Sequence, residues 1–117
     1  MMELPVVNHK DYFAKIGDDH KFPINKFGDL ADYLIEKKIV KKFHEPYPCS
    51  QETLLRAHSE KYIKDITNKT LDENGVKKIG FPLVDSVIKR SFVATGGTVL
   101  ASKLAVSSGL ACNLSLI

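Results

Sequence analysis

The stretch that decides the fold runs from Leu83 to Ser107 and reads LVDSVIKRSFVATGGTVLASKLAVS. Its apolar residues recur at helical spacing and predict one long helix; they are Val84, Val87, Ile88, Phe92, Val99 and Val106. Gly96 and Gly97 lie inside this pattern, where each glycine costs roughly 1 kcal/mol of helix propensity relative to alanine. We therefore expect the pair to mark a place where the helix packs closely against a neighbour.

Strands are predicted on either side of the long helix. Gly109 is a natural helix C-cap, and the apolar run 110–114 that follows it predicts a buried strand. Leu4 to Val7 predicts a short first strand, and Ile39 to Phe43 predicts another. The polar segments 8–25 and 68–78 are predicted to be loops.

Three further helices are expected, each beginning at a residue that can cap free backbone N–H groups. Asn25, Ser50 and Ser59 are these caps. The first helix carries one apolar stripe, made by Phe27, Leu30, Ala31, Leu34 and Ile35. Strands, helices and the long helix in this order indicate an α/β fold with a parallel sheet covered by helices. Two or three strands make a poor sheet of this kind, so we expect residues 1–117 to be the N-terminal part of an incomplete fold.

Composition favours a soluble, cytoplasmic protein with no membrane partner. Hydrophobic residues make up 44% and charged residues 26% of the chain. Neither a bilayer-spanning apolar run nor a signal peptide is evident. The net charge is +3, with a local basic cluster at Lys37, Lys38, Lys41 and Lys42. This cluster could contact nucleic acid, but aromatic interleaving and a nucleic-acid motif are missing, so we predict a solvated helix end and no nucleic-acid partner.

The histidines and cysteines are the candidate catalytic groups. Asp18-Asp19-His20 contains an Asp-x-His step, but a catalytic zinc needs a third ligand, and the spacing of His9, His44 and His58 supplies no obvious one. Cys49 could be imagined as a nucleophile beside His44 or His58, although no feature of the sequence would lower its pKa. There is no G-x-S-x-G motif. We therefore predict no catalytic and no metal-binding residue, and no cofactor, in this chain.

Several segments, in this order and spacing, resemble the zinc-dependent histone deacetylase family, in particular its bacterial, class IV-like and acetoin-utilisation-like branch. The matching stretches are Leu4–Val7 with His9 and Tyr12, His20–Phe27, Glu52–His58 with Tyr62-Ile63, Ile79–Pro82, and Gly96-Gly97-Thr98 running into Gly109–Ser115. The resemblance implies a three-layer arginase/deacetylase-like fold. It also implies hydrolysis of acetyl-lysine or related amides, in which zinc activates the water.

The same resemblance implies that the chain stops short of the catalytic residues. After a segment like Ala111–Ser115 the family continues with Gly-Gly-x-His-His, whereas this chain continues with Leu116-Ile117. We thus expect 1–117 to be a partial deacetylase-like domain, its N-terminal third, truncated before the His-His stretch. By resemblance alone, the residues lining the substrate channel are His20, Phe22, Pro23, Lys26, Gly80, Phe81 and Pro82.

Two functions follow from these expectations. The first is a truncated deacetylase-like protein that is inactive alone, since zinc belongs to the complete members of the family. The alternative is a small interaction module that pairs with itself or with a separate, complementary chain through exposed strand edges. A third hypothesis, a new zinc enzyme built on Asp18, His20 and another histidine, needs a ligand that the spacing does not supply.

Overall fold

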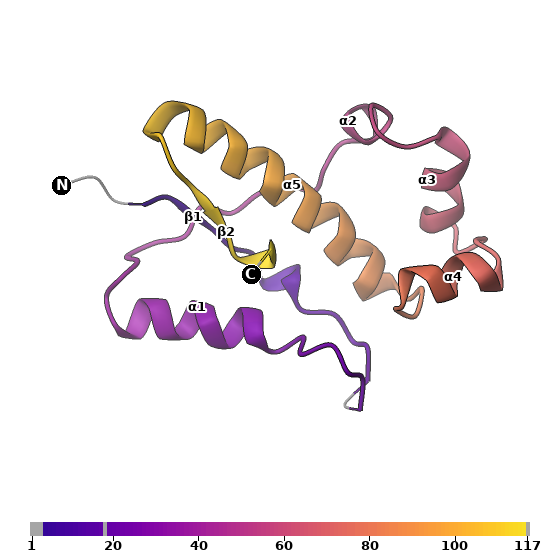
Figure 1. The fold of residues 1–117 in the computed structure, drawn as a ribbon, viewed down its shortest axis with the longest axis horizontal. Helices are drawn as coiled ribbons and strands as arrows, with labels where there is room; N and C mark the ends of the chain where they lie inside the picture. Colours follow the sequence, from indigo (N-terminus) through magenta and orange to yellow (C-terminus); the bar gives the residue numbers. More distant parts are fainter. Residues whose placement is uncertain (1–3, 18, 117) are drawn as a thin grey trace.

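The computed structural model describes residues 4–17 and 19–116 and shows a mostly helical protein (Figure 1). In chain order the elements are β1 (Val6–Val7), the 3-10 helix η1 (Lys10–Tyr12), α1 (Lys26–Glu36), α2 (Gln51–Leu54), α3 (Glu60–Thr67), α4 (Glu73–Ile79), α5 (Asp85–Ser108), β2 (Cys112–Asn113) and the 3-10 helix η2 (Leu114–Leu116).

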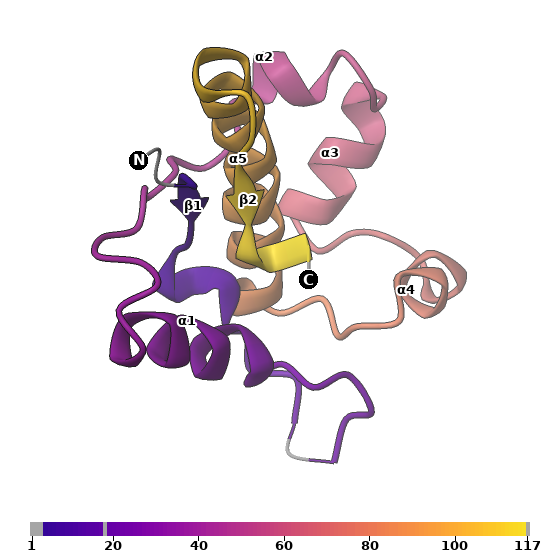
Figure 2. The same ribbon diagram turned by 60° about the vertical axis from the view of Figure 1, so that its left-hand side comes forward.

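The long helix α5 is the element around which the others are arranged. In both ribbon views, β1 and α1 lie on one side of α5, and α2, α3 and α4 form an arm on its other side, while β2 passes in front of α5 in the second view (Figures 1 and 2). The molecule is thin, with principal extents of 50 × 35 × 17 Å. Its radius of gyration is 15.5 Å, compared with about 13.4 Å for a compact domain of this length. The arrangement is therefore more open than that of an ordinary domain.

The prediction of one long helix is confirmed, and so is the prediction of close packing at its glycine pair. A Cβ atom added at Gly96 would overlap the carbonyl oxygen of Tyr47, and one added at Gly97 would overlap the hydroxyl of Tyr12. The predicted apolar stripe is only partly buried, because Val106 is 89% exposed. Gly109 ends the helix with φ +92°, and its N–H donates to the Ala105 carbonyl, as expected for a C-cap.

The sheet consists of β1 and β2, which pair in parallel with Val6 opposite Cys112 and Val7 opposite Asn113. On the other side of β1, the His44 N–H donates to the Val6 carbonyl at 2.9 Å. His44 is an isolated bridge, so the predicted strand 39–43 is wrong. The reason lies at the end of α1, where the backbone N–H groups of residues 39 and 40 fold back to the Leu34 carbonyl and are not available to a sheet.

The predicted α/β fold class, a three-layer arginase/deacetylase-like parallel sheet, is also wrong for this chain. Each strand is two residues long, so the sheet is too short and narrow to form a layer that helices could cover on both faces. Helix, strand and loop side chains together fill the main core instead. Its buried members are Val6, Tyr12, Phe27, Ala31, Val40, Val93 and Leu114.

Helix starts were predicted well at two of the three proposed caps. The hydroxyls of Ser50 and Ser59 each accept a backbone N–H three residues later, at 3.2 Å. Asn25 precedes α1 as predicted, but its side chain makes no capping hydrogen bond.

The predicted loop 68–78 is wrong in its second half, which forms α4. The signals for this helix were Asp72, whose carboxylate accepts the Gly75 N–H at 2.7 Å, and Gly80, which ends the helix at φ +81°.

No helix in the part of the chain that the structure describes combines the length and the apolar character needed to cross a membrane. The longest, α5, contains polar residues throughout, including Lys89, Arg90 and Lys103.

The glycine packing leads to a first prediction. Replacing Gly96 with alanine should lower the free energy of unfolding by about 1–3 kcal/mol, because the new methyl group meets backbone that cannot rotate away. The matched control is Gly28→Ala in α1, where nothing lies within 4 Å of the added Cβ. This change should stabilise the protein by up to about 1 kcal/mol through helix propensity. Urea unfolding followed by circular dichroism measures both, and equal effects of the two changes would contradict the packing argument.

Candidate functional site

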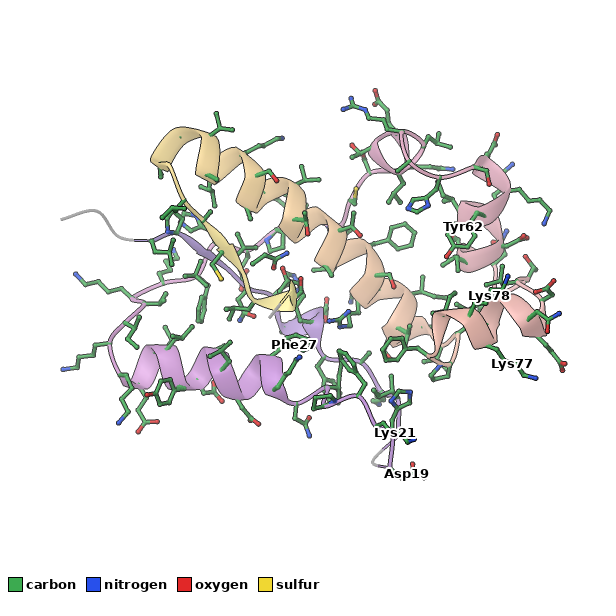
Figure 3. All side chains as sticks on the ribbon, in the orientation of Figure 1. Asp19, Lys21, Phe27, Tyr62, Lys77 and Lys78 are labelled. Atoms are coloured by element: carbon green, nitrogen blue, oxygen red, sulfur yellow. The ribbon has the colours of Figure 1, made fainter. Side chains whose placement is uncertain are left out.

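The candidate site is an aromatic cluster, defined here as His20, Phe22, Phe27 and Phe81. The His20 and Phe81 rings stack with centroids 5.2 Å apart and planes 12° apart. The edge of Phe22 meets Phe81 at 5.2 Å and 87°, and Phe22 lies 6.0 Å from Phe27. Figure 3 shows Phe27 at the start of α1, with Lys21 and Asp19 farther out at the tip of the loop. The cluster therefore joins the loop 13–25, the start of α1 and the turn before α5.

His20 is the hydrogen-bonding member of the aromatic cluster. Its Nδ1 accepts the backbone N–H of Phe22 at 3.0 Å, and its Nε2 lies 3.1 Å from the carbonyl oxygen of Gly80. Both contacts are satisfied when Nε2 carries the proton and donates to Gly80. The imidazole thus ties the loop to the turn between α4 and α5, sixty positions away in the sequence.

The structure brings together most of the residues that the resemblance places at the channel. His20, Phe22, Gly80 and Phe81 are in mutual contact through the stacking and hydrogen bonds above. The Lys26 ammonium lies 5.4 Å from the Phe22 ring centroid and 5.2 Å from that of Phe27. Pro23 and Lys26 line an open cavity of about 680 Å³ on the outer side of the loop. Pro82 is exposed and follows Phe81 in the turn.

Arg90 is a site residue that the sequence reasoning missed. Its Nε donates to the Tyr12 carbonyl at 2.7 Å, and its guanidinium carbon lies 4.9 Å from the Phe27 ring centroid. Burial lowers the pKa of Arg90 from its ordinary value, although the group stays charged. The sequence did offer one indication, because Arg90 lies within the apolar helix pattern 83–107. A charged side chain at such a position is expected to need a hydrogen-bonding partner.

A buried polar contact lies between the aromatic cluster and the sheet. The Tyr12 hydroxyl donates to the Asn113 side-chain oxygen at 2.6 Å, directly above Gly97. The Asn113 amide nitrogen donates to the Ala94 carbonyl and to the Thr98 hydroxyl, both at 3.3 Å. Burial raises the pKa of Tyr12, so the phenol remains protonated and keeps donating. This contact was not predicted from the sequence.

No zinc site forms among the residues that the structure describes. Within residues 4–17 and 19–116, no three His, Cys, Asp or Glu side chains converge on one point. Asp18, half of the candidate Asp-x-His step, lies outside the described residues, and both ring nitrogens of His20 already have hydrogen-bond partners. Burial raises the pKa of the Cys49 thiol, which makes the reactive thiolate less available.

Comparison with known proteins gives no family assignment. No protein-family model matches the chain. The chain is 34% identical, over 114 residues, to an uncharacterized protein of the cyanobacterium Picosynechococcus sp.. The match covers 96% of this chain and 38% of the relative. This chain therefore spans well under half the length of the curated relative that it matches.

The hydrogen bonds of His20 lead to a second prediction. His20→Ala removes two hydrogen bonds and a ring stack, and we expect it to lower the free energy of unfolding by about 1–3 kcal/mol. His58→Ala is the matched control, because His58 is exposed and only its ring, 5.5 Å from that of Tyr62, makes a described contact. That change should alter the free energy of unfolding by no more than about 0.5 kcal/mol. Amide hydrogen exchange should also quicken at Phe22 in His20→Ala alone, and unchanged exchange there would contradict the tether.

Proposed function

We propose that this chain supplies part of the substrate channel of a deacetylase-like hydrolase in the cytoplasm and does not hydrolyse amides by itself. The observation that carries the proposal is the contact between His20 and Phe81. The resemblance puts both His20–Lys26 and Gly80–Pro82 beside the channel, and these segments, distant in sequence, lie against each other in the fold. The aromatic cluster is the kind of apolar wall that a flexible aliphatic acyl-lysine side chain could follow.

The proposed inactivity rests on the side chains that the chemistry needs. The 117 residues contain no adjacent pair of histidines, which the family uses to move protons. No donor set for zinc forms within the described residues, so no hydrolytic step is assigned to any of them. Without a metal to lower its pKa, water is a poor nucleophile for an amide.

A third prediction tests this proposal by assay. The purified chain, supplied with zinc, should release no acetate from an acetyl-lysine peptide. Co-expressed with the part of the Picosynechococcus relative that this chain does not match, it should hydrolyse the peptide, because the proposal places the catalytic residues outside this chain. In that mixture Phe81→Ala should lower kcat/KM by about tenfold or more through lost substrate positioning.

The control variant for the assay is Tyr47→Ala, because Tyr47 is 89% exposed and lies away from the aromatic cluster. It should leave kcat/KM within about twofold. Acetate release by the isolated chain with zinc would overturn the proposed inactivity. Equal losses for Phe81→Ala and Tyr47→Ala would overturn the assignment of the aromatic cluster to the channel.

A second candidate function is an interaction module that pairs with another copy or with a complementary chain. It is favoured by apolar side chains exposed at the end of α5 and just before β2, where Val106 is 89% and Leu110 is 73% exposed. β2 pairs with β1 along one edge, and among the described residues no strand pairs with its other edge. An open strand edge beside exposed apolar side chains is a suitable surface for strand addition.

A fourth prediction concerns this surface. If copies associate, light scattering after size exclusion should give a mass that rises with concentration above 13.1 kDa. The double variant Val106→Lys with Leu110→Lys should return a monomer, because two charges in the contact oppose association. The control is Leu4→Lys, a comparably exposed apolar residue at 52%. A monomer at all concentrations would remove self-association and leave only a complementary chain as the partner.

A further inference from the structure

We propose that Arg90 and the cavity beside it bind small carboxylates that carry a short apolar group. The cavity has a volume of about 220 Å³ and lies beneath the loop 13–25. Apolar side chains from three separate segments form most of its wall, among them Ile16, Ile79, Phe81 and Val87. Arg90 contributes the cation, and Ser91 contributes a hydroxyl.

The guanidinium of Arg90 is held in place, and no carboxylate among the described residues forms an ion pair with it. Its Nε is used by the Tyr12 carbonyl, and the rings of Phe27 and Phe22 lie 4.9 and 6.0 Å from its central carbon. Among the described residues, its two terminal nitrogens have no hydrogen-bond partner and no carboxylate within ion-pair distance, and they are not sealed from solvent. A half-buried cation without a counter-ion is costly, and a bound anion would relieve that cost.

The geometry favours a carboxylate over other anions. A guanidinium with free terminal nitrogens presents N–H groups in a planar fork that matches the two oxygens of a carboxylate. The Ser91 hydroxyl donates to the Val87 carbonyl at 2.9 Å, so it adds no free donor for further oxygens. A phosphate would therefore leave charged oxygens against Ile16, Val87 and Phe81, whereas the apolar group of a carboxylate would pack on these side chains.

A second cation stands near the same rings and would draw anions towards the site. Lys26 lies within 5.4 Å of the Phe22 centroid and lines the larger outer cavity. Among the described residues, Asp29 is the acidic residue that lines that outer cavity, and the Asp11 carboxylate pairs with the Lys89 ammonium at 3.4 Å. Arg90 and Lys26 therefore place two positive charges beside the Phe22 ring. This site depends only on the described contacts and would stand if the proposed hydrolase relationship failed.

The sequence offers a direct test, because Arg56 and Arg90 are its two arginines and Arg56 is exposed. Each gives one side-chain Nε–Hε signal in a ¹H–¹⁵N NMR spectrum, so titration of the intact chain with sodium butyrate reads both sites together. We expect the Arg90 signal to shift saturably in the millimolar range while that of Arg56 stays in place. Neutral butyramide should cause no such shift, and inorganic phosphate should bind at least about tenfold more weakly than butyrate.

Two variants complete the test. Arg90→Lys keeps the charge but loses the planar fork and should weaken butyrate binding by about tenfold or more, whereas Arg56→Lys should not change it. No saturable shift of Arg90, equal shifts of Arg90 and Arg56, tighter binding of phosphate, or an unchanged affinity in Arg90→Lys would each overturn the site. Should Arg90→Lys fail to fold, the two signals of the unmodified chain still decide the outcome.

Discussion

The close contact between the Gly96–Gly97 surface of α5 and the segments that cross it is the constraint on which the structure depends. Without Cβ atoms, α5 approaches the Tyr47 carbonyl on one side and the Tyr12–Asn113 hydrogen bond on the other. That approach lets Asn113 reach the Ala94 carbonyl of the helix and keeps β2 beside β1. A two-residue strand pair is marginal in isolation, so the helix that lies against it is what makes it persist.

The residues that pack on Gly97 also fix the position of the Arg90 guanidinium at the candidate site. Tyr12 donates to Asn113 through its hydroxyl and accepts from Arg90 through its carbonyl. A single residue thus links the polar contact above Gly97 to the cation beside Phe27. Because backbone and side chain of Tyr12 are held at once, the guanidinium is positioned before any ligand arrives, which lowers the entropy that binding would cost.

The open shape of the molecule and its exposed apolar side chains bear on both candidate functions. The chain matches 38% of the length of its Picosynechococcus relative, and its surface carries large apolar residues at the end of α5 and before β2. A wall of a channel needs an opposite wall, and an exposed strand edge needs a neighbour. Both proposed roles therefore require this chain to contact another polypeptide.

Local signals in the sequence determined the elements whose stabilising groups are close in the chain. The serine caps of α2 and α3, the apolar run of α5 and its Gly109 ending depend on neighbours within a few residues, and these were predicted correctly. The close packing at Gly96 and Gly97 was also indicated, because two adjacent glycines weaken a helix unless tight contacts offset their low propensity. The fold class was not predicted correctly, because two-residue strands and the helical arm α2–α4 replace the expected sheet.

Only the tertiary structure decided which distant residues meet. The contacts of His20 with Gly80 and Phe81, of Tyr12 with Asn113, and of Arg90 with the Tyr12 carbonyl join segments 60 to 101 positions apart. The resemblance placed two of these segments near one channel, but no local pattern distinguishes an arginine on a solvated helix face from one that lies over a phenylalanine ring. That difference arises from how α5 crosses the loop 13–25 and α1, and hence from packing that the order of residues along one helix does not encode.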